Sequence, residues 1–318
     1  MGAAHEQQGD AAHGFQTENI IVTATETLTK AREIGTVVPG FNIPYLPMMA
    51  PTVQALRDTN SFGLIMVARL EWVKFEARSI EAIAEEYRRV GDPRHTRLHL
   101  DHVPVIDEDN LQVDFVGDIS RALAAGYESV MVDGSRLSLA ENIAATKQIV
   151  DLAHARGVMV EGELGAVMGH ESGPLPPYEE LFASGKGFTD PQEAARFVQE
   201  TGVDWLSVAV GSIHGAISCA TRSQKKVEAR LNIGHLEKLR QATGVPLVLH
   251  GGTGIRKEYV MQAIRHGIAK INIGTATRQR YEHFVKESVS KAQQAVYDAA
   301  VKVIREDLEV EGTALVLR

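Results

Sequence analysis

The stretch that decides the fold is "SVMVDGSRLSLAENIAATKQIVDLAHARGVMVEGEL", residues 129 to 164. It begins with an apolar run (129–133), continues with a segment of helical period that ends at a glycine (139–157), and closes on a second apolar run (158–164). In the middle segment Ile143, Ile149 and Val150 fall on one face, as in a helix that covers a sheet. The pattern therefore predicts a strand, a helix and a second, parallel strand.

The same alternation continues in both directions along the chain. Short runs rich in Val, Ile and Leu give eight candidate strands, at 36–43, 63–68, 97–102, 129–133, 158–164, 205–210, 246–250 and 269–274. Helical patterns separate them, and the one at 190–202 opens with Asp190 and Pro191 in good N-cap and first-turn positions and ends in Gly202. Strands with continuous hydrophobicity are typical of parallel sheets covered on both faces.

These eight units, with no break in composition, predict an α/β fold with a single (β/α)8 TIM barrel over residues 19–278. A C-terminal helical extension follows at 279–318, with one long helix expected at about 279–308, and residues 1–18 read as a polar, mobile tail. A doubly wound open sheet is the alternative. The first strand is followed by no GxGxxG motif, which favours the closed barrel.

Composition argues against several classes of protein. The 33 Lys and Arg against 41 Asp and Glu give a net charge of −8, and no basic stretch is interleaved with aromatic residues, so we expect no nucleic-acid partner. No apolar segment approaches the length of a membrane span, and the first residues resemble neither a signal nor a transit peptide. With a single cysteine, Cys219, the sequence is compatible with the cytoplasm, which is where we expect the protein.

Polar residues gather where the predicted strands end, and in a barrel these ends share one mouth. They are Asp101, His102, Asp133, Glu161, Glu163, His214, His250 and Asn272. Three imidazoles with an open fourth position are typical of a catalytic zinc site, in which the metal acts as a Lewis acid. We therefore predict His102, His214 and His250 as metal ligands.

Two further residues share the inner side of these strands. By strand alternation His99 lies on the side of Asp101, deeper in the barrel, and we expect it beside the ligands rather than among them. Lys270 shares the side of Asn272. A Schiff-base lysine and a buried or rim ion pair both stay open for it.

Glycine-rich loops follow the last three strands, at 210–215, 250–254 and 271–278. Barrels often bind phosphate after the seventh and eighth strands through backbone N–H groups, and Ser212, Thr253 and Thr275 add hydroxyls there. The glycines could instead serve tight turns only. A metal ligand and a phosphate loop in one peptide, "HGGTG", favour a phosphorylated substrate.

A long connection, residues 166–190, contains several glycines and prolines. Loops of this length in compact barrels are usually functional, so we expect a mobile lid over the mouth.

Several motifs in this order carry a family resemblance: "LHLDH", "SVMVDGS", "FTDPQEAARFVQETGVDWLSVAVGSIHG", "PLVLHGGTGI" and "GIAKINIGT". Over residues 28–278 the chain resembles the class II, zinc-dependent ketose-bisphosphate aldolases, which include the fructose-bisphosphate and tagatose-bisphosphate aldolases. The resemblance implies a lyase that reversibly cleaves a ketose (bis)phosphate to dihydroxyacetone phosphate and an aldehyde, through an enediolate that zinc stabilises.

The resemblance also assigns roles to single residues. Glu163 matches a carboxylate near the metal, Asp101 the acid/base at the C4 hydroxyl, and Asn272 the asparagine that hydrogen-bonds the enediolate. Glu171 falls where the mobile loop carries the glutamate that moves the proton at the carbanion carbon. The positions that match the phosphate cradle are Gly215, Gly251, Gly252, Thr253 and Thr275, and an arginine such as Arg278, Arg280 or Arg136 could reach a distal phosphate.

Several positions depart from the family pattern. Ala68 stands where a serine is usual, Val103 where a glycine follows "LDH", and Gly274 and Ala276 alter the segment after the eighth strand, while Arg69, Trp72 and Arg136 could form a re-shaped specificity pocket. Alternatives thus stay open: a ketose phosphate that is not a bisphosphate, a zinc hydrolase on the same barrel, or a sugar-phosphate binding protein. Zinc or another divalent transition metal, a monovalent cation, and a homodimer or homotetramer are also implied by the resemblance.

Overall fold

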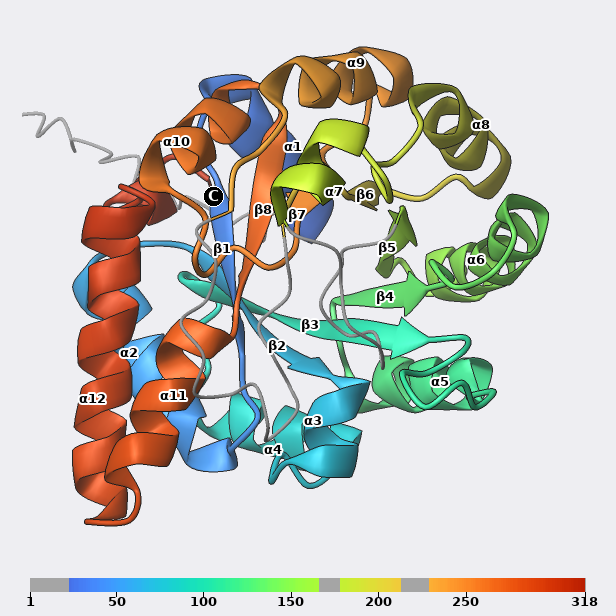
Figure 1. The fold of residues 1–318 in the computed structure, drawn as a ribbon. Coiled ribbons are helices and arrows are strands. Elements are labelled where there is room, and N and C mark those ends of the chain that lie inside the picture. Colours follow the sequence, from blue (N-terminus) through green and yellow to red (C-terminus); the bar gives the residue numbers. More distant parts are fainter. Residues whose placement is uncertain (1–22, 166–177, 213–228, 318) are drawn as a thin grey trace, which may run out of the picture.

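The computed structural model describes residues 23–165, 178–212 and 229–317. Within this part of the chain eight parallel strands form a closed barrel in sequence order, and β8 pairs with β1 (Figure 1). The strands are β1 (Val38–Asn42), β2 (Gly63–Ala68), β3 (Thr96–Pro104), β4 (Ser129–Asp133), β5 (Met159–Leu164), β6 (Trp205–Val208), β7 (Leu247–Leu249) and β8 (Ile268–Ile273). The predicted (β/α)8 barrel is confirmed, and each predicted strand contains or overlaps an observed one.

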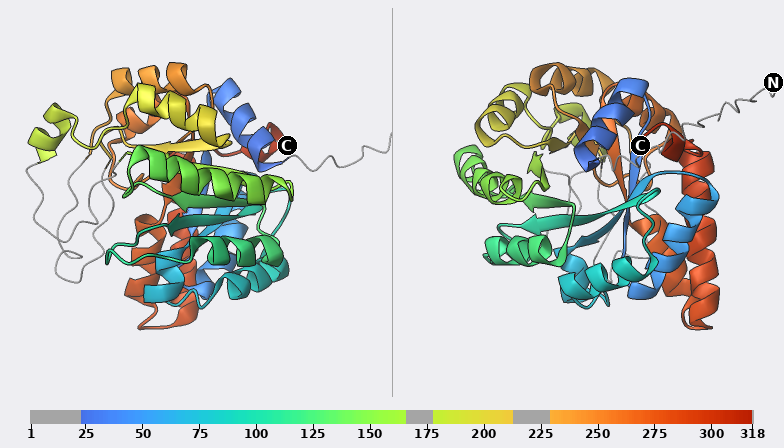
Figure 2. Two further views of the ribbon diagram at one scale, coloured as in Figure 1. Left: turned by 90° about the vertical axis from the view of Figure 1, so that its right-hand side faces the viewer. Right: turned by 180° about the vertical axis from the view of Figure 1, so that it is seen from behind.

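Helices surround the barrel (Figures 1 and 2). They are α1 (Ala24–Ile34), α2 (Met49–Asp58), α3 (Arg69–Lys74), α4 (Ile80–Val90), α5 (Phe115–Ala125), α6 (Leu139–His154), α7 (Tyr178–Ser184), α8 (Pro191–Thr201), α9 (Ile233–Thr243), α10 (Lys257–Arg265), α11 (Thr275–Phe284) and α12 (Val289–Lys302). The expected start of α8 is present: Asp190 accepts hydrogen bonds from the N–H groups of Gln192 and Glu193, and Gly202 ends the helix in the left-handed region.

Two groups of buried apolar residues hold the layers together. The larger fills the space between the strands and the helices, where α6 contributes Ile143, Ile149 and Val150. The smaller fills the amino-terminal end of the barrel, where Trp205 and Leu28 pack together with residues near the C-terminus. Figure 2 shows α1 beside the C-terminus at this end. The opposite, carboxyl end of the strands is therefore the end that carries polar side chains.

The C-terminal extension differs from the single long helix expected. Two helices, α11 and α12, form it, because Ser288 caps a new helix by accepting a hydrogen bond from the N–H of Lys291. Helix α12 packs on α2 (Figure 1). Past α12, the N–H groups of Gly312 and Ala314 donate to the carbonyls of Thr59 and Asn60, so the chain end is bonded to the segment between α2 and β2.

Among the helices described, none is long and apolar enough to cross a membrane.

Candidate active site

Strand β3 delivers two consecutive residues to the mouth of the barrel. Its register against β4 shifts between Leu100 and Val103, and His102 has a φ of 30°, in the left-handed region. Consecutive residues of a regular strand point to opposite faces, whereas a bulge re-aims one of them. The irregularity explains how Asp101 and His102 both reach one cluster: ligand atoms of Asp101, His102 and His250 lie within 4.8 Å of one another.

The imidazoles of His102 and His250 face each other with ring centroids 4.3 Å apart. Nδ1 of His102 lies 3.2 Å from Oδ2 of Asp133 and 3.5 Å from Oε2 of Glu163. Nδ1 of His250 also lies 3.5 Å from that oxygen of Glu163. Four side chains from β3, β4, β5 and the end of β7 thus meet around one point.

This cluster fits a divalent transition metal. Oε2 of Glu163 is buried, and no hydrogen bond from the described residues reaches it, although two imidazole nitrogens lie 3.5 Å away. Buried polar atoms without a hydrogen bond are rare in proteins and ask for an explanation such as an ion. Imidazole nitrogens and carboxylate oxygens are the ligands that zinc and its neighbours bind.

The charges in the cluster are strongly coupled. Burial, together with the nearby charge of Asp133, raises the pKa of Glu163 well above its usual range. For His102, burial alone would lower the pKa, but the charge of Asp101 and the hydrogen bond to Asp133 raise it to about 10. The metal-free site therefore carries a proton on His102, which a metal ion would have to displace.

Asp101 lies next to this cluster and is held from two sides. Nδ2 of Asn42 donates to Oδ2, and Nδ2 of Asn272 donates to Oδ1, both at 2.9 Å. Burial opposes ionisation of Asp101, but the neighbouring His102 and Lys270 outweigh it, so the pKa of the carboxyl is lowered. The carboxylate is therefore ionised, fixed in orientation and able to accept a proton.

Below the mouth lies a buried ion pair. Nζ of Lys270 lies 2.7 Å from Oε2 of Glu161, and Oε1 of the same carboxylate lies 3.0 Å from Nε2 of His250. His99 joins this group from β3, as expected for a residue deeper than Asp101. Burial, with the charge of Lys270, lowers the pKa of His99 to about 3, so this imidazole is neutral.

The predicted phosphate loops lie at the same end of the barrel. Gly251 has a φ of 67°, which favours glycine, and a Cβ on Gly252 would lie 2.5 Å from Cγ2 of Ile271, so the loop packs directly on β8. Thr275 begins α11. Ser212 is buried, and its hydroxyl has no hydrogen-bond partner within residues 23–165, 178–212 and 229–317. The hydroxyls and amides predicted for anion binding are thus present at strand ends.

Arg278 lies in the first turns of α11 and is already engaged. Its Nη1 lies 2.9 and 3.1 Å from the two carboxylate oxygens of Glu282, and its guanidinium lies over the ring of Phe75, 5.4 Å from the centroid. Tyr45 donates to Glu282 at 3.0 Å. An incoming phosphate would have to compete with Glu282 for this arginine.

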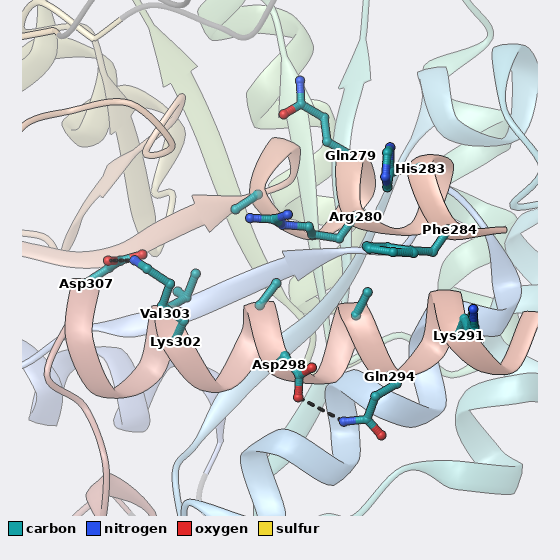
Figure 3. Close-up of a pocket in the computed structure, with 13 residues that line it drawn as sticks. Gln279, Arg280, His283, Phe284, Lys291, Gln294, Asp298, Lys302, Val303 and Asp307 are labelled. Atoms are coloured by element: carbon teal, nitrogen blue, oxygen red, sulfur yellow. Dashed lines mark hydrogen bonds and ion pairs between the residues drawn. The ribbon is translucent and has the colours of Figure 1, made fainter. Parts of the chain in front are cut away.

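The hollow drawn in Figure 3 lies elsewhere, between α11 and α12, with a volume of about 990 Å³. Arg280 and His283 line it from α11, and Lys291 and Asp298 from α12. None of the strand-end residues of the mouth belongs to its lining. Arg280, one of the arginines considered for a distal phosphate, therefore contributes to this outer groove.

Three predicted site residues, Glu171, His214 and Gly215, lie outside the described residues, as does Cys219. Two others were missed from sequence. Asn42 could have been found, because it ends the first apolar run as Asp101 and His250 end theirs. Glu71 gave no such signal. It lies in α3, and its buried carboxylate accepts from the N–H of Ala68 at 2.8 Å.

Comparison with known proteins adds independent findings. Residues 22–314 match the family model described as "Fructose-bisphosphate aldolase class-II". The chain is 34% identical over 275 residues, 85% of this chain and 87% of the relative, to a protein of Bacillus subtilis (strain 168) named "Probable fructose-bisphosphate aldolase". It is also similar to the crystal structure of the YdjI aldolase from Escherichia coli K12, with a TM-score of 0.70, 26% identity and coverage of 92% and 99% of the two chains. A structure from Coccidioides immitis, titled a putative fructose-1,6-biphosphate aldolase, gives a TM-score of 0.73 at 25% identity, with coverage of 92% and 98%.

Proposed function

The chain belongs to the class-II fructose-bisphosphate aldolase family and is a metal-dependent aldolase; we propose that it cleaves a ketose bisphosphate at the mouth of the barrel, using Asp101 beside a zinc site. The observation that carries this proposal is the meeting of Asp101, His102 and His250 at one point. One residue can exchange a proton there while its neighbours hold a cation.

We assign the metal to His102, His214 and His250, with Glu163 close by. The two imidazoles within the described residues, with the buried oxygen of Glu163 between them, support the assignment. When bound, zinc or another divalent transition metal supplies Lewis-acid stabilisation of the negative charge that develops on substrate oxygen.

Asp101 is our candidate for the acid/base. As an ionised carboxylate it takes the proton of the C4 hydroxyl during cleavage and returns it during synthesis. The amides of Asn42 and Asn272, each 2.9 Å from one of its oxygens, keep it in place. Because Asn272 follows β8 toward the same mouth, we also assign to it a hydrogen bond to the donor half of the substrate.

The remaining roles follow the same reading. Glu171, in the long connection, moves the proton at the carbanion carbon. A phosphate group binds at the loops after β6, β7 and β8, with a monovalent cation beside it. The residues proposed for this phosphate are Ser212, Gly215, Gly251, Gly252, Thr253 and Thr275, and Arg278 is proposed for the distal end of the substrate.

A Schiff-base mechanism at Lys270 is disfavoured. Its ammonium is fully buried and lies 2.7 Å from Glu161, below the layer of Asp101 and His250. A nucleophilic amine must reach the substrate carbonyl and lose its proton, and this ion pair opposes both.

The names of the relatives point to fructose 1,6-bisphosphate as the first substrate to test. Ala68, Val103, Gly274 and Ala276 depart from the family pattern, so the aldehyde need not be glyceraldehyde 3-phosphate. We also propose a homodimer or homotetramer in the cytoplasm.

The test is deuterium exchange from D2O into dihydroxyacetone phosphate, followed by mass spectrometry. It probes the donor half-reaction without knowledge of the aldehyde. We expect exchange that chelation abolishes and metal restores, loss of exchange in Glu171→Gln, and retained exchange with lost cleavage in Asp101→Asn. Should metal-loaded wild type show no exchange, dihydroxyacetone phosphate is not the donor. Loss of exchange in folded, metal-loaded Asp101→Asn would mean that the proton roles are misassigned.

A further inference from the structure

A lysine is buried in the barrel interior directly beneath the proposed metal centre. Nζ of Lys270 lies 2.7 Å from Oε2 of Glu161, 3.4 Å from Nε2 of His99 and 3.9 Å from Oδ1 of Asp101. Lys270, Glu161 and His99 are each 0% exposed. A buried ion pair contributes little net stability compared with apolar packing, so its presence here asks for another role.

The hydrogen bonds of Lys270 determine the tautomer of His99. An ammonium group has donors only, so Nε2 of His99 must accept and carries no proton. The proton of this neutral ring is therefore on Nδ1, which lies 2.8 Å from the hydroxyl of Ser129 and donates to it.

The same reasoning, one step further along, reaches His250. Glu161, ionised beside Lys270, has acceptors only, and its Oε1 lies 3.0 Å from Nε2 of His250. Nε2 of His250 must therefore carry a proton. The other ring nitrogen, Nδ1, is directed to the cluster, 3.5 Å from Oε2 of Glu163.

We propose that Lys270 is a positioning residue for the metal centre: it fixes Glu161, and Glu161 holds His250 in the Nε2–H tautomer with the Nδ1 lone pair facing the metal. The inference rests on the proposed function only for the location of the metal. Carboxylates that accept from the second nitrogen of a ligating histidine set its tautomer and orientation in this way. Here the carboxylate itself is fixed by a buried cation.

The barrel makes room for this lysine at Gly40. A Cβ on Gly40 would lie 2.4 Å from Sδ of Met66 and 3.4 Å from Cε of Lys270. The glycine in β1 thus allows the long side chain to cross the interior and reach β5, whose Glu161 is 109 residues away in sequence.

The test compares Lys270→Met, Glu161→Gln and the double variant in a double-mutant cycle on metal affinity. Lys257→Met is the matched control, because it removes the same charge from the surface pair with Glu309 at 2.5 Å. On protein shown to be folded by circular dichroism, competition with a chromophoric chelator gives the Kd for Zn²⁺. We expect each single variant to bind about 10–100-fold more weakly, the range typical of residues that orient a ligand. The double variant should be little worse than either single variant, and the control should be unchanged.

A second readout reports the tautomer directly and needs no substitution. In ¹⁵N spectra of the metal-free wild type, Nε2 of His250 should have the shift of a protonated ring nitrogen and Nδ1 that of a lone-pair nitrogen. A protonated Nδ1 in the neutral ring overturns the inference, even if Lys270→Met does not fold. So does a folded Lys270→Met protein whose Kd for Zn²⁺ lies within about twofold of wild type, far below the effect expected for an orienting residue.

The two proposals fail separately. Metal affinity and tautomer are measured without substrate, so an inactive protein with the expected Kd values would refute the proposed reaction and leave the role of Lys270 intact. Conversely, metal-dependent exchange with unchanged affinity in Lys270→Met would refute only the positioning role.

Discussion

Asn42 and Asp101 are joined by a 2.9 Å hydrogen bond from Nδ2 to Oδ2, although their strands are separated by β2 in the barrel. Asn272 binds the other oxygen from β8. The carboxylate of Asp101 is thus suspended between two amides that approach from different strands. Since both bonds go to a charged group, each is expected to contribute about 1.5–3 kcal/mol to holding it.

Replacing Asn42 by Ala should therefore reduce cleavage without removing the metal. Losing one such bond corresponds to roughly a 10–100-fold fall in kcat/KM. Steady-state kinetics and metal analysis of the purified variant check this. Asn232→Ala, which removes the N-cap of α9 away from the mouth, is the control for a general loss of stability. Full activity in Asn42→Ala would show that Asn272 alone is sufficient to place Asp101.

Metal removal should inactivate the enzyme and lower its Tm. The metal binds the folded chain only, so at 100 times its Kd it stabilises the protein by about 2.7 kcal/mol. Calorimetry with and without a chelator, followed by re-addition of Zn²⁺, measures this difference. In His250→Ala the gain in Tm on adding metal should disappear together with activity. An unaltered gain would place the metal away from His250.

Glu71 gives a pH dependence that is separate from the metal ligands. Burial, opposed in part by the hydrogen bond from Ala68, raises the pKa of Glu71 to about 8 from an ordinary value of 4.5. The folded state then holds a proton that the unfolded state has lost, so this group makes stability fall as pH rises from about 4.5 through about 8. The Glu71→Gln variant should gain stability relative to wild type between pH 5.5 and pH 9.

Tm differences between variant and wild type at several pH values test this expectation. The control is Glu81→Gln, because Arg121 lowers the pKa of Glu81 to about 2, against burial. A carboxyl with a depressed pKa loses its contribution only in acid, so this control should show a constant difference over the same range. A Glu71→Gln difference that does not change with pH would mean that Glu71 ionises normally.

Arg278 and Glu282 offer a test of the distal phosphate site. If Arg278 receives that phosphate, Arg278→Ala should raise the KM for fructose 1,6-bisphosphate, with a smaller effect on kcat, because it removes binding common to ground and transition state. Glu282→Gln removes the competing carboxylate, which lies 2.9 Å from Nη1, and should lower that KM. Unchanged KM values in both variants would assign the pair to packing against Phe75 alone.

The sequence by itself determined the barrel. Hydrophobic runs and helical periods are local properties, so the eight strands could be found one by one, and strand alternation placed His99 deeper than Asp101 and Lys270 beside Asn272. Capping residues such as Asp190 gave helix starts for the same local reason. The single C-terminal helix was wrong because Ser288 interrupts a pattern that otherwise continues.

Only the tertiary structure decided which of the strand-end side chains touch. Asn42 and Asp101 are 59 residues apart in sequence, His250 and Glu161 are 89 apart, and Lys270 and Glu161 are 109 apart. Alternation says which side of a strand a residue faces, but its neighbours across the barrel depend on strand tilt, on stagger and on the bulge after Leu100. Those quantities are set when the sheet closes, so a contact between distant strands such as that of Asn42 with Asp101 could not be read from the residues alone.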